Sequence, residues 1–291
     1  MMARDFHKKL AKKIVKNMVS NFLYLVPSEL RYEICRHHVN KEFAENRSDF
    51  RTNGEFWLIE KILPYVKTVF DVGAHTGGWA ARVLQLSSSV DLHCFEPSLK
   101  SFTALQKRKL GANVSCNHFG LGASSCRRTL YLFEESGEGD SLYLRSGLQS
   151  RDRFVRQNLT EQVEIRTLDS YFKKKKIAEI DFLKIDVEGN ELEVIEGGKG
   201  TFERERVKIV QFEYGGTYID SRILLRNFFD FFGGMNYSFF LLYPKQIRLV
   251  PKYDQRLENF QYKNFLIVNN GVVKEIDIFQ GEHTHGQEDV K

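Results

Sequence analysis

The stretch Val69-Phe70-Asp71-Val72-Gly73-Ala74-His75-Thr76-Gly77 decides the fold. A short apolar run, typical of a buried strand, leads into an acid-and-glycine turn, and residues 78–86 beyond it have helical character. Glycines at such a turn let the backbone bend sharply and let a ligand approach closely. The spacing is Asp-x-Gly-x-x-x-Gly, whereas a dinucleotide site has Gly-x-Gly-x-x-Gly. The unit predicts an α/β domain with a ligand turn, and it disfavours a nicotinamide dehydrogenase.

Two acids near this turn indicate the class of ligand. A helix N-terminus favours an anion, but the carboxylate of Asp71 at the strand end repels a pyrophosphate and attracts an ammonium group. Glu96, followed by Pro97, ends the next predicted strand 25 residues later, near the spacing of about 20 residues for an acid that accepts ribose hydroxyls. A plain surface glutamate is the alternative. Together the acids favour a ligand with an amino-acid part and a ribose.

Outward from this unit, strand-like and helix-like runs alternate, which predicts a mostly parallel sheet with helices on both faces. We expect strands at 69–72, 90–95, 113–121, 180–186, 207–212, 237–243 and 260–268, and helices at 78–86, 98–110, 191–202 and 221–232. Residues 126–169 interrupt the alternation with two strand-like runs around a polar loop. They predict a β insertion over the sheet, and loops of this kind often cover active sites.

Ligands of an open α/β sheet bind outside the carboxyl ends of its strands, so residues after the other strands belong to the same crevice. Gly120-Leu121-Gly122 follows the third strand and suits an adenine face or an ordinary turn. Lys184-Ile185-Asp186-Val187-Glu188 ends the fourth, and alternation places its three ionisable side chains on one side. Such groups are costly at a buried strand end unless paired or used. Either an ion pair holds this strand end or the segment is functional, and we favour function.

Asp186 and Glu213, which lies at the end of the fifth strand, are the candidates for chemistry. They suit a general base and a hydrogen-bond acceptor, or they hold a divalent cation such as Mg²⁺ through hard oxygen ligands. We expect Asp186 to be the first candidate for the base and Glu213 the second. Glu188 and Lys184 would support them.

These segments together resemble the FkbM-type methyltransferases, within the class I fold that binds S-adenosyl-L-methionine. The resemblance spans roughly residues 68–268 and rests on residues 69–77, 95–97, 120–122, 167–169 and 180–189, with Glu191, Gly197 and Glu213. It implies a Rossmann-like, seven-stranded, mostly parallel sheet with helices on both faces and an antiparallel last strand.

The resemblance also implies the cofactor and the reaction. It places Asp71, Gly73 and Gly77 around the methionine part of S-adenosyl-L-methionine and Glu96 on its ribose hydroxyls. Asparagine is the more usual residue at the His75 position. Family members are mostly O-methyltransferases that act on sugars and small natural products. The further candidates for cofactor binding are Ala74, His75, Thr76, Pro97, Leu121, Gly122 and Asp186.

The ends of the chain lie outside the resemblance. We expect an N-terminal helical extension over residues 1–67, the methyltransferase domain at 68–270, and a strand end with a mobile tail at 271–291. Residues 6–25 carry apolar residues at every fourth position and lysines on or beside the other face. This helix either packs on the domain or pairs with a second subunit, or it rests on an anionic membrane surface. We favour packing or pairing.

Composition narrows the class of protein. The 291 residues, 42% of them hydrophobic, suffice for one large α/β domain with an extension. No segment approaches the roughly 20 apolar residues of a membrane span, and the basic start lacks the apolar region of a signal peptide. Four cysteines without a Cys-x-x-Cys pair favour reduced thiols in the cytoplasm. Lysine runs without interleaved aromatics are weak support for nucleic-acid binding, despite a net charge of +5.

The sequence therefore predicts an S-adenosyl-L-methionine-dependent O-methyltransferase whose acceptor is a sugar, a glycan or a small natural product. Two alternatives stay open: an RNA methyltransferase, and a non-catalytic binding or assembly protein on the same fold. The intact set of Asp71, Glu96 and Asp186 argues against a decayed site.

Overall fold

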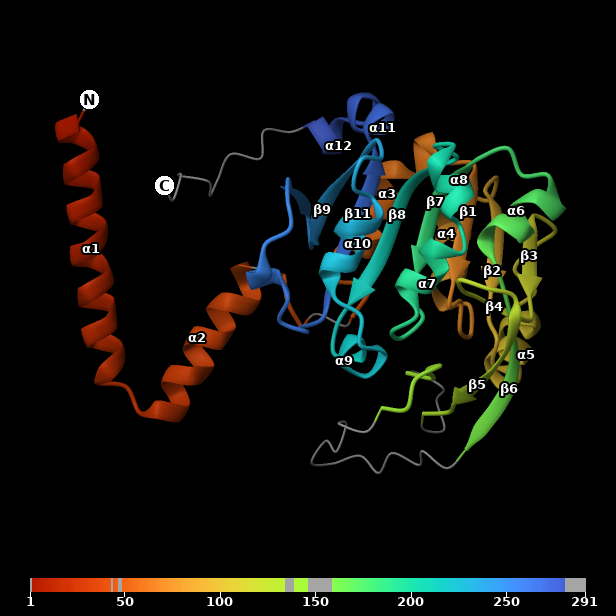
Figure 1. Ribbon diagram of the computed structural model, residues 1–291, viewed down its shortest axis with the longest axis horizontal. Helices are drawn as coiled ribbons and strands as arrows, with labels where there is room; N and C mark the ends of the chain where they lie inside the picture. Colours follow the sequence, from red (N-terminus) through yellow and green to blue (C-terminus); the bar gives the residue numbers. More distant parts are fainter. Residues whose placement is uncertain (1, 43, 47–48, 134–138, 146–158, 281–291) are drawn as a thin grey trace. The chain divides into compact units, whose positions relative to one another are not determined.

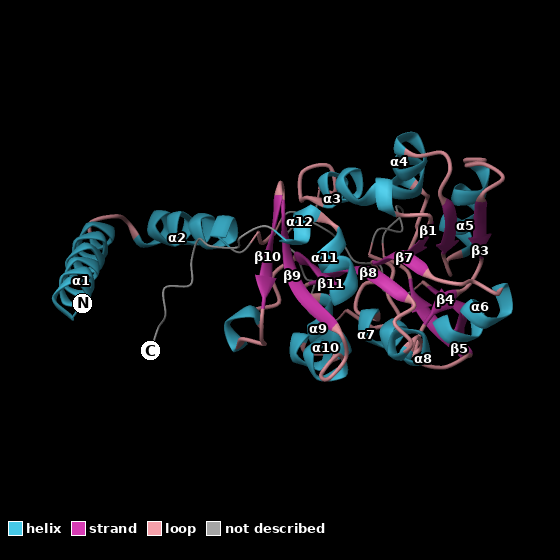
Figure 2. Ribbon diagram, turned by 90° about the horizontal axis from the view of Figure 1, so that it is seen from above, coloured by secondary structure: helices cyan, strands magenta, loops and turns pink. Residues whose placement is uncertain are grey.

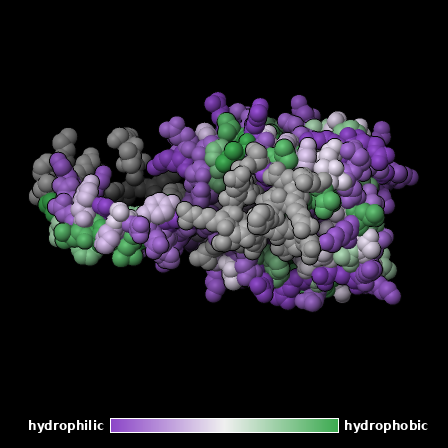
Figure 3. All heavy atoms as spheres, turned by 90° about the horizontal axis from the view of Figure 1, so that it is seen from below, coloured by the Kyte–Doolittle hydropathy of each residue, from purple (hydrophilic) through white to green (hydrophobic). Residues whose placement is uncertain are grey.

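The structure, a computed structural model, describes residues 2–42, 44–46, 49–133, 139–145 and 159–280. The chain forms two compact units, Met1–Glu45 and Asn46–Lys291. The smaller unit holds α1 (Met2–Tyr24) and α2 (Ser28–Glu42). Several of its apolar side chains, among them Met18 and Phe22, are exposed, and Figure 3 shows hydrophobic side chains gathered along one side of these helices. Among the described residues, no helix has the length and apolar character that crossing a membrane requires.

The larger unit is built on an eight-stranded sheet with the order β10-β9-β11-β8-β7-β1-β2-β3 (Figure 1). Its strands are β1 (Thr68–Val72), β2 (Asp91–Phe95), β3 (Val114–Asn117), β7 (Ile180–Ile185), β8 (Val207–Tyr214), β9 (Tyr237–Tyr243), β10 (Gln246–Val250) and β11 (Lys263–Asn269). Strands β3, β2, β1, β7 and β8 pair in parallel, and β11 runs antiparallel to both β8 and β9. The expected mostly parallel sheet with an antiparallel last strand is confirmed.

Strand β10 is an eighth strand that the sequence analysis did not anticipate. It forms a hairpin with β9 at the edge of the sheet, and only Ile247 of its five residues is buried. Its sequence, Gln246-Ile247-Arg248-Leu249-Val250, alternates polar and apolar residues, so the missed strand did carry a local signal, in a run of only five residues. The missed strand therefore extends the sheet without changing the expected core.

Helices cover both faces of the sheet (Figure 2). One face carries α3 (Glu55–Ile62), which continues into a 3₁₀ turn (Leu63–Tyr65), and α4 (Gly78–Leu86), α5 (Leu99–Lys107), α11 (Asn270–Glu275) and α12 (Asp277–Gln280). The other face carries α7 (Glu191–Glu196), α8 (Lys199–Glu203), α9 (Thr217–Ser221) and α10 (Leu225–Phe231). Fully burying a Leu, Ile or Phe side chain stabilises the fold by about 1.5–3 kcal/mol. These two apolar layers hold the strand ends in place.

Two boundaries differ from the expected ones. The larger unit begins at Asn46 and not at residue 68, because Leu58, Ile59 and Ile62 of α3 are fully buried in its core. Residues 271–280 continue as helix instead of starting a tail, and Ile276 and Phe279 pack into the same core. The expected mobile tail at 281–291 lies outside the described residues.

A small second sheet corresponds to the expected β insertion. It has the order β4-β6-β5 and consists of β4 (Gly120–Leu121), β5 (Cys126–Tyr131) and β6 (Thr160–Arg166), and α6 (Leu168–Lys175) follows it. Leu130, Val163 and Ile165 form its apolar core. Residues 139–145 lie in the connection between β5 and β6. The other parts of that connection, residues 134–138 and 146–158, lie outside the described residues.

Candidate active site

A cavity of about 180 Å³ lies at the carboxyl ends of β1, β2 and β7, bounded on one side by the small sheet. Of the expected cofactor-binding residues, those that line it are Gly73, His75, Glu96, Pro97, Leu121 and Asp186. Those that do not line it are Asp71, Ala74, Thr76, Gly77 and Gly122. The structure thus brings three separate strand ends to one hollow, as the parallel sheet requires.

The turn after β1 is built from backbone. Gly73 has φ +84°, and a Cβ at this position would lie 1.8 Å from the carbonyl oxygen of Asp186. The N–H groups of Gly73 and Ala74 both donate to the carbonyl oxygen of Phe95 at 3.0 Å. Any side chain at Gly73 would push the β1 and β7 loops apart. The wall of the cavity therefore depends on the missing side chain.

Glu96 is a buried carboxylate oriented by the backbone. Its Oε2 accepts from the N–H of His75 and its Oε1 from the N–H of Ser98, both at 2.8 Å. Burial raises the pKa of Glu96 to about 7, and these two backbone hydrogen bonds oppose the rise. Each carboxylate oxygen retains acceptor capacity. A fixed acceptor pair beside the cavity suits two neighbouring hydroxyl groups.

Asp71 lies behind the wall of the cavity and is fully buried. Neither of its carboxylate oxygens has a hydrogen-bond partner. Burial raises the pKa of Asp71 to about 6, and the nearby Lys184 ammonium opposes that rise. A buried acceptor without a partner is costly, and such groups concentrate at functional sites. From this position Asp71 can influence a ligand in the cavity only through its charge, not by direct contact.

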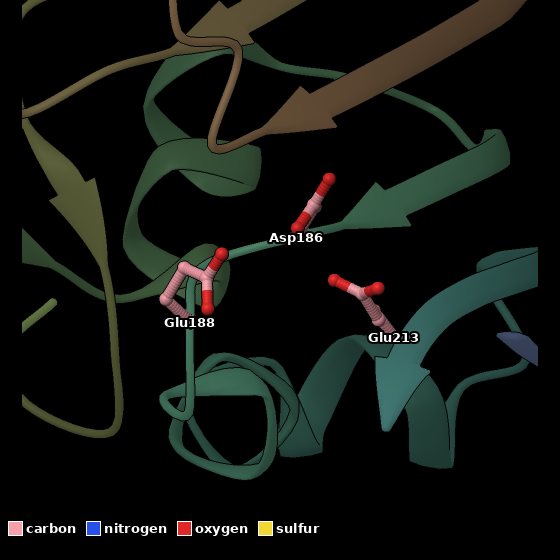
Figure 4. A group of neighbouring side chains, drawn as sticks. All are labelled: Asp186, Glu188 and Glu213. Carbon is pink, nitrogen blue, oxygen red and sulfur yellow. The ribbon is translucent and has the colours of Figure 1, made fainter. Parts of the chain in front are cut away.

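Three carboxylates meet beyond the end of β7, in the arrangement shown in Figure 4. Asp186, Glu188 and Glu213 each place one oxygen within 4.8 Å of the others. Burial, with the negative charge of Asp186 next, raises the pKa of Glu188 to about 7 and that of Glu213 well above its usual range. Like charges this close oppose one another's ionisation, so the surroundings of Glu213 favour its neutral form. Lys184 completes the group, because its Nζ lies 2.8 Å from Oδ2 of Asp186.

Two residues of this cluster were missed by the sequence analysis. Arg145, from the β insertion, lies with a guanidinium nitrogen 3.4 Å from Oε2 of Glu188, and its other terminal nitrogen donates to the hydroxyl of Tyr262 at 3.1 Å. No sequence motif indicates a functional role for Arg145, because it is a single arginine in the loop of the β insertion. Tyr262 directly precedes β11, and an antiparallel strand brings its amino end to the edge where parallel strands end. That topological rule would have found Tyr262.

This chain is similar in sequence to known methyltransferases. The Methyltransferase FkbM domain matches residues 71–239. The 2-O-methyltransferase NoeI of Sinorhizobium fredii is 28% identical over 181 residues, which cover 60% of this chain and 72% of NoeI. Two solved structures, each 10% identical, are a precorrin-6y C5,15-methyltransferase from Geobacter metallireducens (TM-score 0.40, 78% of this chain and 94% of that one) and an rRNA methylase from Streptococcus thermophilus (TM-score 0.41, 77% and 99%).

Proposed function

This chain belongs to the FkbM methyltransferase family, which it matches over more than half of its length, and we propose that it transfers a methyl group to a hydroxyl of a sugar, a glycan or a small natural product. The observation that carries the proposal is the pairing of two unlike sites at one cavity. Glu96 is positioned for hydroxyl groups of a cofactor, and a carboxylate cluster stands beside it. Similarity to a 2-O-methyltransferase also favours an oxygen as the atom that accepts the methyl group.

The residues around the cavity fit S-adenosyl-L-methionine. Glu96 would hold the ribose hydroxyls, and the apolar wall that includes Leu121 and Ile165 would take the adenine. The charge of Asp71, whose carboxylate oxygens have no hydrogen-bond partner, favours a cationic ligand over a pyrophosphate. When bound, S-adenosyl-L-methionine supplies the methyl group from its positively charged sulfonium centre.

For the acceptor half of the reaction we propose the side chains at the carboxyl ends of β7 and β8. An acceptor hydroxyl must lose its proton as its oxygen gains the methyl group, so that ROH becomes ROCH₃ and one proton is released. We assign that proton to Oδ1 of Asp186, since its Oδ2 already accepts from Lys184. Glu213, whose pKa burial raises, would in its neutral form donate a hydrogen bond to the acceptor. Holding the acceptor in line supplies much of the rate enhancement.

A divalent cation between Asp186 and Glu213 is the competing way to weaken the acceptor's proton. The spacing of the three carboxylates favours it. The buried Lys184 ammonium bonded to Asp186 favours the base instead, since it already supplies the positive charge that a cation would bring. Methyltransferase activity that survives EDTA supports Asp186 as the general base. Activity that EDTA abolishes and Mg²⁺ restores supports the divalent cation instead.

For the smaller unit we propose association through α1, either with another copy of the chain or with the anionic inner face of a membrane in the cytoplasm. The support is the exposed apolar face, which includes Met18 and Phe22. Flotation with anionic and zwitterionic vesicles, beside light scattering in solution, separates the two. A chain lacking residues 1–25 that behaves unchanged in both assays removes the proposal.

The proposed reaction is tested by incubating the purified protein with methyl-labelled S-adenosyl-L-methionine and fractionated cell extract. We expect label in a methyl ether of a glycan or small molecule, and none with Asp186→Asn. Label in RNA would replace the acceptor class with a nucleic acid. Label in no fraction, together with tight cofactor binding, would point to a binding protein.

A further inference from the structure

Glu55, at the start of α3, is a buried carboxylate outside the family-matched residues, and it lies close enough to Lys184 and Asp186 for their charges to interact. We infer that Glu55 is a positioning residue, which holds the Lys184 ammonium so that Lys184 in turn holds the Asp186 carboxylate. The inference rests on the proposed function, because the role of Asp186 is assigned there.

The turn before α3 places Glu55 firmly. Gly54 has φ +111°, and a Cβ at this position would lie 2.3 Å from the carbonyl oxygen of Tyr243, at the end of β9. The Asn53 amide donates to Oε1 of Glu55 at 2.6 Å and its oxygen accepts from the N–H of Glu55 at 2.9 Å. These contacts and the buried core side chains of α3 leave the carboxylate one position. A helix start clamped in this way is a rigid support for a charge.

Strand register places Glu55 and Lys184 on the same face of the sheet. Lys184 pairs with Asp71 on β1 and with Gln211 on β8, so the three side chains point to one side. Phe182 and Ile209, two residues earlier on their strands, pack in the same core cluster as α3. The helix that carries Glu55 therefore covers the face from which Lys184 projects. Asp186 lies on that face as well, one step nearer the cavity.

Charge supplies the reason for the arrangement. The Lys184 side chain is 6% exposed and forms one close ion pair, to Asp186. Burying an ammonium costs several kcal/mol unless opposite charges surround it. Burial lowers the pKa of Lys184, whereas the carboxylates of Asp186, Asp71 and Glu55 together raise it above its usual value. Without Glu55 the ammonium loses one of the three carboxylates that stabilise it, and its position beside Asp186 is less tightly held.

A purely structural role is the alternative. Glu55 is an acid in the first turn of α3, where it also interacts favourably with the helix dipole. In that case its loss lowers the stability of the fold and affects the reaction only in proportion. The two roles differ in whether the effect passes through Lys184.

Glu55→Gln tests the inference, and Glu60→Gln is its matched control. Glu60 lies on the same helix but is exposed and pairs with Arg82 at 3.1 Å. We expect Glu55→Gln to lower kcat about tenfold, with the affinity for S-adenosyl-L-methionine from calorimetry unchanged and Glu60→Gln equal to the unmodified protein. Should Glu55→Gln lose its fold, Asn53→Ser removes only the clamp and is expected to lower kcat several-fold.

A double-mutant cycle with Lys184→Met decides between the two roles. If Glu55 acts through Lys184, the double variant is no slower than Lys184→Met alone. Independent effects that multiply, or a Glu55→Gln variant with normal kcat, overturn the inference. Those outcomes need an active unmodified protein, whereas an unmodified protein that methylates no hydroxyl rejects the proposed function itself.

Discussion

The proposed cofactor half and the proposed acceptor half of the site are built in different ways. The cofactor half, the turn from Gly73 to Gly77 with Glu96, is held by backbone groups, and even the Glu96 carboxylate is oriented by two backbone N–H donors. The acceptor half consists of charged side chains that hold one another, centred on Lys184, Asp186 and Glu188. Substitutions that change the shape of the backbone should therefore disrupt the cofactor half. Substitutions that remove a charge should disrupt the acceptor half.

The largest expected effect is on shape. Gly73→Ala should weaken binding of S-adenosyl-L-methionine at least a hundredfold, because its Cβ would meet the carbonyl oxygen of Asp186 and its φ is positive. Gly78→Ala is the control, since a Cβ there meets nothing within 4 Å. Thermal shift with and without the cofactor measures both. Equal cofactor shifts for the two variants would contradict a backbone-built cofactor half.

The next effect separates the two carboxylates of the acceptor half. Asp186→Asn should lower kcat about 100-fold or more, as expected for loss of a general base. Glu213→Gln should cost roughly tenfold or less, because a glutamine resembles the neutral form of the carboxyl group, which burial favours at Glu213. Steady-state rates with the labelled acceptor test the order. A larger loss for Glu213→Gln would exchange the two roles.

A smaller effect tests whether the β insertion takes part in the acceptor half. Arg145→Met removes the guanidinium beside Glu188 and should lower kcat/KM for the acceptor about tenfold, with cofactor affinity retained. Arg226→Met is the control, because Arg226 forms an exposed pair with Asp230. If both variants keep full kcat/KM, residues 139–145 have no part in the reaction.

The smallest effect is on stability. Burial raises the pKa values of Glu96 and Glu188 from 4.5 to about 7. Below pH 4.5 these groups are protonated in both states, and above pH 7 the folded protein bears the full cost of ionising them. The ligand-free protein should therefore lose a few °C of Tm as pH rises from about 5 to 7.5. Glu96→Gln should flatten this slope, and a Tm that rises across the window would contradict it.

The same contrast explains how much could be predicted from the sequence. The strands before Gly73 and Glu96 are short apolar runs that end in an acid or a glycine turn. Such a pattern is local, so the positions of these strands could be read from neighbouring residues. The acceptor half depends on contacts between distant segments, and Arg145 and Glu55 carry no local pattern that points to them. Lys184 and Asp186 were found because they end a buried strand, where an ionisable side chain is costly unless it is paired or functional. The short edge strand β10 was missed although its sequence alternates polar and apolar residues.

Calorimetric titration with S-adenosyl-L-methionine tests the two-part account most directly. Three proteins are compared: the unmodified chain, Glu96→Ala and Glu213→Gln. The account predicts one cofactor site on the unmodified chain, the same affinity for Glu213→Gln, whose side chain does not line the cavity, and a loss of about a hundredfold for Glu96→Ala. No binding to the unmodified chain, or equal binding by Glu96→Ala, would contradict it.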